Sequence, residues 1–311
     1  MGPGEQETTA RPIGHIYYGT CGWTDRTLIQ SGFYPATARS AADRLNYYAR
    51  QFPLVEVDST YYSLPSQRNA ELWAKRTPEY FLFNIKAYGA LTHHPVEVAR
   101  LPQDVRALLP AFEADKNRIY LNAIPPEGQE ILWDIHTEAL RPLAELGKLG
   151  CVLFQFPPWF RKNRTTVAYL EQLSERLPYP IAVEFRGGGW MDEDRQKSTL
   201  EILKGNDLAY VVVDEPQGFK SSVPQVIACT APLAVIRFHG HNAATWEARG
   251  ISPAERFKYL YSEDELKAWV RPIYQLASQA DQVHALMNNC YSDYAVRNAR
   301  QLADLLSKDQ G

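Results

Sequence analysis

The sequence lacks the motifs by which several protein classes are recognised. Its four cysteines, Cys21, Cys151, Cys229 and Cys290, are far apart and form no C-x-x-C pair, which excludes a zinc knuckle and a dithiol motif. There is no H-E-x-x-H metal motif, and the run Gly187-Gly188-Gly189 is not followed by the Lys-Ser/Thr of a phosphate-binding loop. Reduced, mostly buried thiols in a cytosolic protein are the simplest interpretation of the cysteines.

The chain also lacks an excess of positive charge and any long apolar run. Its formal net charge is -3, which argues against a strongly electrostatic nucleic-acid or membrane binder but leaves room for a local basic pocket. No stretch approaches the ~20 apolar residues of a membrane helix. Residues 1–14 contain no apolar run, so we expect a flexible lead-in there rather than a signal peptide, with residues 308–311 similar.

Short apolar runs alternate with amphipathic, helix-like stretches along the rest of the chain, a pattern typical of βαβ units and a parallel sheet. The predicted strands are Ile16–Thr20, Leu54–Asp58, Tyr80–Lys86, Gly150–Phe156, Ile181–Phe185, Leu208–Asp214, Leu233–His239 and Gln282–Asn288. Eight units favour a single α/β domain over residues 15–307, a closed (β/α)8 TIM-type barrel, with an open doubly wound sheet as the alternative. We also expect an inserted helix near 129–146, a long loop near 240–260, and a poorly marked helix after the sixth strand.

Alternation within these strands predicts which side chains face the barrel interior. If the apolar set faces the helices, the inward polar set is Glu56, Asp58, Asn84, Lys86, Gln155, Glu184, Arg186, Asp214, Arg237 and His239, with Asn288 or Asn289 from the last strand. These residues fall near the carboxyl ends of the strands, where barrel enzymes carry their active sites. A buried network of ion pairs that only shapes the barrel mouth is the alternative, because buried charges must be paired.

The candidate catalytic residues are the groups suited to proton transfer: Glu56, Asp58, Glu184, Asp214 and His239. Carboxylates in unlike environments hold different pKa values, as acid–base chemistry requires. The candidate substrate-binding residues are cations, amides, a histidine and aromatics near strand ends: Trp23, Tyr61, Lys86, His93, Gln155, Arg186, Trp190, Arg237, Asn288 and Asn289. Arginine and lysine suit an anionic substrate, and aromatics can stack a sugar or nucleobase or can simply anchor loops.

No cofactor is predicted, although His and carboxylate groups leave a divalent metal possible. The interspersed cations would repel such an ion, and they fit an anionic small molecule or a flexible nucleic-acid substrate better. Nothing in the sequence indicates a membrane or an obligate protein partner.

An ordered series of short motifs runs from about Gly19 to Leu306. The segments are Gly19-Thr20-Cys21-Gly22-Trp23, Phe33-Tyr34-Pro35, Val55-Glu56-Val57-Asp58-Ser59-Thr60-Tyr61-Tyr62, Trp73, Thr77-Pro78, Phe83-Asn84-Ile85-Lys86-Ala87, Leu91-Thr92-His93, Leu153-Phe154-Gln155-Phe156-Pro157-Pro158, Val183-Glu184-Phe185-Arg186, Trp190, Val213-Asp214-Glu215-Pro216, Arg237-Phe238-His239-Gly240 and Asn288-Asn289. With these motifs the chain resembles the domain of unknown function 72 family, also called YecE-like. The resemblance implies a barrel and supplies no reaction. Cys21 stands where Ser is more usual, which weakens any role for a hydroxyl there.

The sequence therefore predicts an enzyme that acts on a phosphate-bearing or sugar-like substrate, with nucleic-acid-related chemistry included. A non-catalytic anion or nucleic-acid binding protein and an interaction scaffold that uses the loop 240–260 are the alternatives, because fold alone does not choose among them.

Overall fold

The computed structural model describes residues 10–309, and their strands close into a parallel barrel in the order β1-β10-β9-β8-β7-β6-β3-β2. This closure confirms the predicted barrel and excludes the open sheet. The barrel strands are β1 (Ile16–Cys21), β2 (Leu54–Val57), β3 (Leu82–Lys86), β6 (Leu149–Gln155), β7 (Ile181–Glu184), β8 (Leu208–Asp214), β9 (Leu233–Phe238) and β10 (Gln282–Met287).

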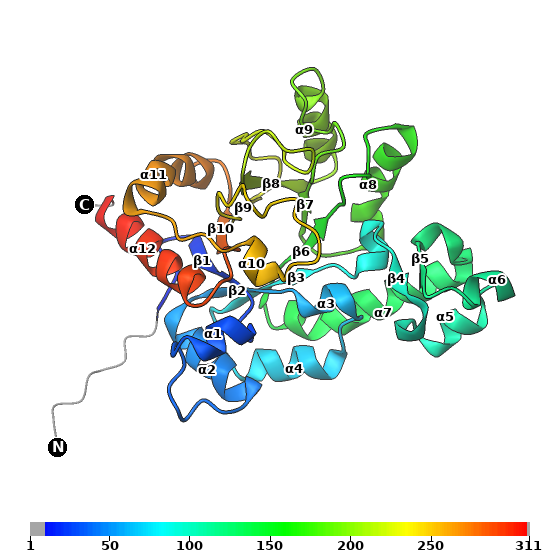
Figure 1. The fold of residues 1–311 in the computed structure, drawn as a ribbon, viewed down its shortest axis with the longest axis horizontal. Helices are drawn as coiled ribbons and strands as arrows, with labels where there is room; N and C mark the ends of the chain where they lie inside the picture. Colours follow the sequence, from blue (N-terminus) through cyan, green and yellow to red (C-terminus); the bar gives the residue numbers. More distant parts are fainter. Residues whose placement is uncertain (1–9, 310–311) are drawn as a thin grey trace.

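Helices surround the barrel on the outside (Figure 1). The longer ones are α2 (Ala41–Gln51), α4 (Gln67–Lys75), α7 (Pro126–Glu145), α8 (Arg164–Arg176), α9 (Gln196–Gly205), α11 (Glu263–Ala277) and α12 (Tyr294–Asp309). Capping motifs in the sequence stabilise the N-termini of two of these helices. The pairs Ser40–Asp43 and Ser262–Glu265 form reciprocal capping boxes, which satisfy backbone N–H groups at the beginnings of α2 and α11. No helix in the described part of the chain is long and apolar enough to cross a membrane.

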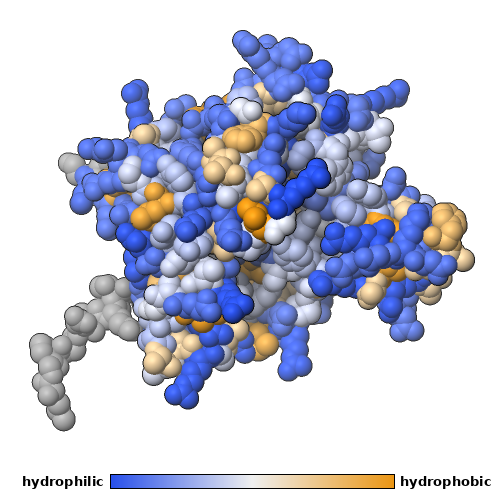
Figure 2. Space-filling model, in the orientation of Figure 1, coloured by the Kyte–Doolittle hydropathy of each residue, from blue (hydrophilic) through white to orange (hydrophobic). Residues whose placement is uncertain are grey.

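The connection between β3 and β6 is the longest departure from a minimal barrel. It contains the antiparallel pair β4 (Val96–Glu97) and β5 (Arg118–Ile119) and the short helices α5 (Gln103–Ala107) and α6 (Ala111–Ala114), and it projects from the barrel body (Figures 1 and 2). The helix predicted near 129–146 is present as α7. Because α7 joins neighbouring strands, it is an ordinary barrel helix, and the inserted part is the segment that precedes it.

Two other predicted features have a clear outcome in the fold. Residues 215–232, after β8, form no helix, so this unit lacks the helix that was poorly marked in the sequence. Residues 1–9 of the predicted lead-in lie outside the described residues, whereas Ala10 donates a backbone hydrogen bond to the carbonyl of Arg50 at the end of α2.

The short helices of the strand-to-helix loops lie together on the face seen in Figure 1: α1 (Arg26–Gln30), α3 (Ser59–Tyr62) and α10 (Pro253–Arg256). They follow β1, β2 and β9, so this face is the carboxyl end of the barrel, where barrel enzymes bind substrates.

Close strand packing below this face depends on small residues. A Cβ added to Gly19 in β1 would lie 1.9 Å from the carbonyl oxygen of Leu54 in β2. Gly19 therefore lets the chain pack against the first residue of β2, and no larger residue fits there without a backbone shift.

Candidate functional site

A single guanidinium joins two carboxylates at the centre of the barrel. Arg237 in β9 is fully buried; its Nε and Nη2 donate to Glu56 in β2 at 3.1 and 2.5 Å. Its Nη1 donates to Oε2 of Glu184 in β7 at 2.5 Å. The three residues come from distant parts of the chain, and all three face the barrel interior, as the alternation within their strands predicted.

Glu184 is the most connected member of this cluster. Its Oε1 accepts from Nε2 of Gln155 at 2.6 Å and lies 3.1 Å from Nε2 of His239 and 3.4 Å from Nη1 of Arg186. The same Nη1 of Arg186 donates to Glu215 at 3.2 Å. Each buried charge in the cluster thus has an opposite charge within hydrogen-bond distance, which buried ions require.

His239 is a neutral member of the network. Burial lowers its pKa to about 4, although Glu184 pulls in the opposite direction. Nδ2 of Asn288 lies 2.7 Å from its Nδ1, and Nε2 faces Glu184. A neutral imidazole protonated at Nε2 satisfies both contacts, because it donates to the carboxylate and accepts from the amide.

The acids of the network differ in their affinity for a proton. Burial raises the pKa of Glu56 to about 7 although Arg237 acts in the opposite direction, and burial also raises the pKa of Glu215 to about 7. Burial acts the same way on Glu184, but Arg237, His239 and Arg186 outweigh it and hold its pKa well below the ordinary value. The cluster therefore contains a permanently ionised carboxylate beside carboxyl groups able to exchange a proton near neutral pH.

A cavity of about 840 Å³ lies at the carboxyl ends of the strands, and Asp58, Lys86, Gln155, Arg186 and Asn288 line it. Nζ of Lys86 is 3.5 Å from Oδ1 of Asp58, an oxygen with no hydrogen-bond partner among the described residues. Glu56 and Glu184 are fully buried and are not among the lining residues, so they lie behind the cavity wall.

Arg186 faces this cavity with part of its hydrogen-bonding capacity unused. Its guanidinium lies 4.4 Å from the ring centre of Trp246, which comes from the loop 240–260. Its hydrogen bonds to described residues both come from Nη1. Nε and Nη2 are therefore free to bind an anion in the fork geometry that arginine offers.

An aromatic wall borders the cavity on the side of the insertion. We use this name for Tyr61, Tyr62, His94 and Trp159, which all line the cavity. Ring centres are 4.9 Å apart for Tyr61 and Tyr62, 5.1 Å for Tyr61 and His94, and 5.7 Å for His94 and Trp159. Burial lowers the pKa of His94 to about 3, so this ring is neutral at physiological pH.

Two of the tryptophans proposed as substrate-binding residues lie away from the cavity. Trp190 is fully buried, stacks on Phe185 at 4.6 Å and donates from Nε1 to the carbonyl of Phe160 at 2.6 Å. Trp23 is buried edge-to-face against Trp73 at 6.0 Å. Both side chains anchor loops, which was the alternative interpretation of these aromatics.

Three further candidates are also turned away from the cavity lining. His93 packs against Tyr169 at 4.5 Å between ring centres, Asn289 donates to the carbonyl of Tyr259, and Asp214 accepts from Nε2 of His241 at 3.0 Å. None of the three lines the cavity, whereas Asn288 does, which resolves the ambiguity of the last strand.

Sequence reasoning missed Glu215, His94 and His241. Glu215 follows the last residue of β8, where strand alternation ends, so parity did not apply to it. His94 lines the cavity and His93 does not; His93 has a left-handed backbone (φ 59°) and ends the short 3-10 helix Gly89–Thr92. The adjacent pair His93-His94 was the only available signal.

Within residues 10–309, no group of three or more His, Cys, Asp or Glu side chains is arranged to hold a metal ion.

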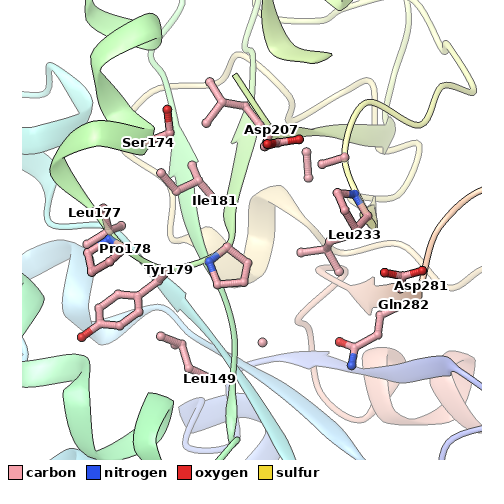
Figure 3. Close-up of a pocket in the computed structure, with 16 residues that line it drawn as sticks. Leu149, Ser174, Leu177, Pro178, Tyr179, Ile181, Asp207, Leu233, Asp281 and Gln282 are labelled. Carbon is pink, nitrogen blue, oxygen red and sulfur yellow. The ribbon is translucent and has the colours of Figure 1, made fainter. Parts of the chain in front are cut away.

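A separate cavity of about 670 Å³ lies at the opposite end of the barrel. Leu149, Ile181, Leu233 and Gln282, the first residues of four strands, line it together with Pro178 (Figure 3). Its lining is largely apolar, and Asp207 and Asp281 are the charged residues among the described side chains that line it. The cations, carboxyl groups and amides that can do chemistry thus gather at the other end.

Comparisons with known proteins agree with this architecture. A family described as "Protein of unknown function DUF72" matches residues 17–311. The UPF0759 protein YunF of Bacillus subtilis (strain 168) is 33% identical over 296 residues, which cover 94% of each chain.

Two solved structures of DUF72 family proteins are also similar. One from Thermotoga maritima is 33% identical, with a TM-score of 0.72 over 94% of this chain and 99% of that chain. One from Enterococcus faecalis V583 is 28% identical, with a TM-score of 0.75 over 94% of this chain and 95% of that one. The resemblance inferred from the motifs is thereby confirmed.

Proposed function

The chain belongs to the DUF72 family, and on that premise we propose that it is an enzyme that acts by proton transfer on a phosphate-bearing or sugar-like small molecule at the mouth of its barrel. One observation carries the proposal: a cavity of about 840 Å³ combines the cations Lys86 and Arg186 with the carboxyl group of Asp58 and with stacking surfaces. Such a combination of an apolar wall and a few convergent polar groups is typical of small-molecule sites.

In this proposal Lys86 and Arg186 bind the anionic group of the substrate. Arg186 has free donors toward the cavity and is held from behind by Glu184 and Glu215. Arg186 is thus pre-organised, and a ligand pays little to order it.

Asp58 is the proposed catalytic residue, because it lines the cavity beside Lys86 and its Oδ1 has no hydrogen-bond partner among the described residues. The proton transferred would move between Asp58 and an oxygen or carbon of the bound substrate. Glu184 and His239 are positioning residues in this proposal, because each is buried behind the lining and contacts a lining residue, Arg186 or Asn288. Glu56 lies one step deeper, where it holds Arg237, the partner of Glu184.

The loop 240–260 supports a role in ligand binding over a role as a scaffold. Trp246, Arg256 and Phe257 of this loop line the cavity, and Trp246 is almost fully buried. A non-catalytic anion binder stays as the second candidate, because the buried network is internally paired and needs no substrate to balance it. We place either activity in the cytoplasm, since all four cysteines are free thiols.

Binding is tested by titrating inorganic phosphate, sulfate and glucose 6-phosphate into the wild type, Lys86→Met and Lys197→Met while the melting temperature is followed. Lys197 is a matched control, an exposed lysine on α9 outside the cavity. A charge-assisted contact is worth about 1.5–3 kcal/mol, so Lys86→Met should weaken binding about ten- to hundredfold and Lys197→Met should not. Equal responses of all three proteins would reject the anion site.

Catalysis is tested by a panel of phosphoesters and sugars, with and without Mg²⁺ or Mn²⁺, on the wild type and Asp58→Asn. Turnover that Asp58→Asn abolishes while ligand affinity is kept supports the enzyme. Binding without turnover by the wild type in every condition supports the non-catalytic binder.

A further inference from the structure

A smaller cavity of about 340 Å³ adjoins the one described above. Its lining includes Tyr61, Tyr62, His94 and Trp159, the same four side chains that line the main cavity. The aromatic wall thus stands between the two cavities and presents surface to both. Tyr62 and Trp159 are 58% and 54% exposed, so their ring faces are open to a ligand that passes along the wall.

The far side of the smaller cavity is cationic and comes from the insertion between β3 and β6. Arg100 and Arg118 line it together with Glu97. Antiparallel pairing places Glu97 in β4 opposite Arg118 in β5, and Glu97 contacts Nε of Arg100 at 2.8 Å and Nη2 of Arg118 at 3.6 Å. One carboxylate is shared by two guanidinium groups, so this end keeps an excess of one positive charge.

Positive groups therefore lie on both sides of a neutral aromatic wall. Lys86 and Arg186 line the main cavity, and Nζ of Lys86 lies 5.2 Å from the ring centre of Tyr61, which belongs to the wall. The wall itself brings no charge at neutral pH, since the pKa of His94 is lowered to about 3 by burial. The cavities thus present a cation, then flat ring surfaces, then a second cation. A ligand that fits this order has an anion, then a ring, then a second anion.

We propose that the two cavities are adjacent subsites for one elongated ligand, a planar or sugar ring that carries an anionic group at each end. The ring lies along the aromatic wall, one anion binds Lys86 and Arg186, and the second anion binds Arg100 and Arg118. This inference rests on the proposed function, because it names the substrate class of the same site. The insertion then has a specific role: it selects doubly anionic ligands over singly anionic ones.

The experiment measures dissociation constants by calorimetry for two matched pairs of probes. AMP is compared with adenosine 3′,5′-bisphosphate, and fructose 6-phosphate with fructose 1,6-bisphosphate. The wild type is expected to bind at least one bisphosphate about tenfold or more tightly than its monophosphate, because a second charge-assisted contact is formed. In both bisphosphates the two anions flank a sugar ring, so the pair that shows the larger advantage tells whether an attached nucleobase adds to binding along the wall.

Variants locate the second anion. Arg118→Met should abolish the bisphosphate advantage and leave monophosphate affinity unchanged, since Arg118 is remote from the first anion in this assignment. Glu97→Gln should preserve or increase the advantage, because it frees both arginines. Arg141→Met is the control, a half-exposed arginine on α7 that is paired with Glu138 outside both cavities and should change nothing.

The outcomes separate this inference from the proposed function. Suppose that monophosphates bind the wild type and that Lys86→Met weakens this binding. If bisphosphates then bind no more tightly than monophosphates, only the two-anion inference is overturned. The same holds if the tighter binding of bisphosphates persists in Arg118→Met. If neither monophosphates nor bisphosphates bind the wild type, the inference falls together with the anion site.

Discussion

Replacing Glu184 by glutamine should destabilise the protein markedly, because the change removes one charge from a fully buried network and alters the volume little. In the wild type the carboxylate contacts Arg237 at 2.5 Å, Gln155 at 2.6 Å and His239 at 3.1 Å. Glutamine keeps one oxygen that can accept a hydrogen bond. Its NH2 group replaces the second oxygen, so a donor then faces the N–H donors that this oxygen accepted from. Breaking a buried ion pair from one side costs about 3–5 kcal/mol, since the remaining charge loses its partner.

This free energy converts into a measurable shift in melting temperature. Unfolding entropy near the midpoint is about 2.1 cal/mol/K per residue, so for 311 residues a loss of 3–5 kcal/mol lowers the melting temperature by about 5–8 °C. Differential scanning calorimetry at pH 7 measures the shift. Glu175→Gln on α8 is the control, because Glu175 is exposed and its substitution should cost no more than about 0.5 kcal/mol.

The pH dependence provides a second check on the same group. The pKa of Glu184 in the folded protein lies well below its ordinary value, so its stabilising contribution is present above the unfolded pKa of about 4.3. That contribution is lost as the pH falls through the folded pKa. The gap between wild type and Glu184→Gln should therefore stay constant from pH 8 to 5 and narrow below about pH 4. A variant that melts within 2 °C of Glu175→Gln at pH 7 would refute the reasoning.

Other perturbations test packing and charge elsewhere. Gly19→Ala should lower the free energy of unfolding in a denaturant melt by about 3 kcal/mol or more, because the added Cβ would lie 1.9 Å from a backbone oxygen. Gly205→Ala is the control: it has open space at the end of α9 and should be neutral or stabilising by up to about 1 kcal/mol. Trp190→Ala should lower stability by about 3–5 kcal/mol and leave phosphate affinity unchanged in calorimetry, since Trp190 is buried outside the cavity; altered affinity would contradict its anchoring role. A hydrogen bond to Asp214 raises the pKa of His241. The wild type should therefore be more stable than His241→Gln by the full amount below about pH 6.5, and this difference in stability should vanish as the pH rises through the folded pKa. A stability difference in thermal melts that does not change with pH would exclude this coupling.

Much of the fold could be predicted from the sequence because the signals for it are local. Alternation with a period of two residues and the helix-like stretches between the strands depend only on neighbours along the chain. The eight predicted strands agree with the barrel strands to within a residue or two at each end, and the barrel is closed. The same alternation placed Glu56, Glu184 and Arg237 inside the barrel, where the structure has them.

Only the tertiary structure decided which buried charges pair with each other and which loop residues face the cavity. Arg237 bridges Glu56 and Glu184, which lie 181 and 53 residues away along the chain, and no local pattern states which cation pairs with which acid. Beyond a strand end the alternation stops, so Glu215 and His94 enter the site while His93 turns into an aromatic core. The pairing of buried charges depends on which strands become neighbours when the barrel closes, because only then are the side chains within hydrogen-bond distance.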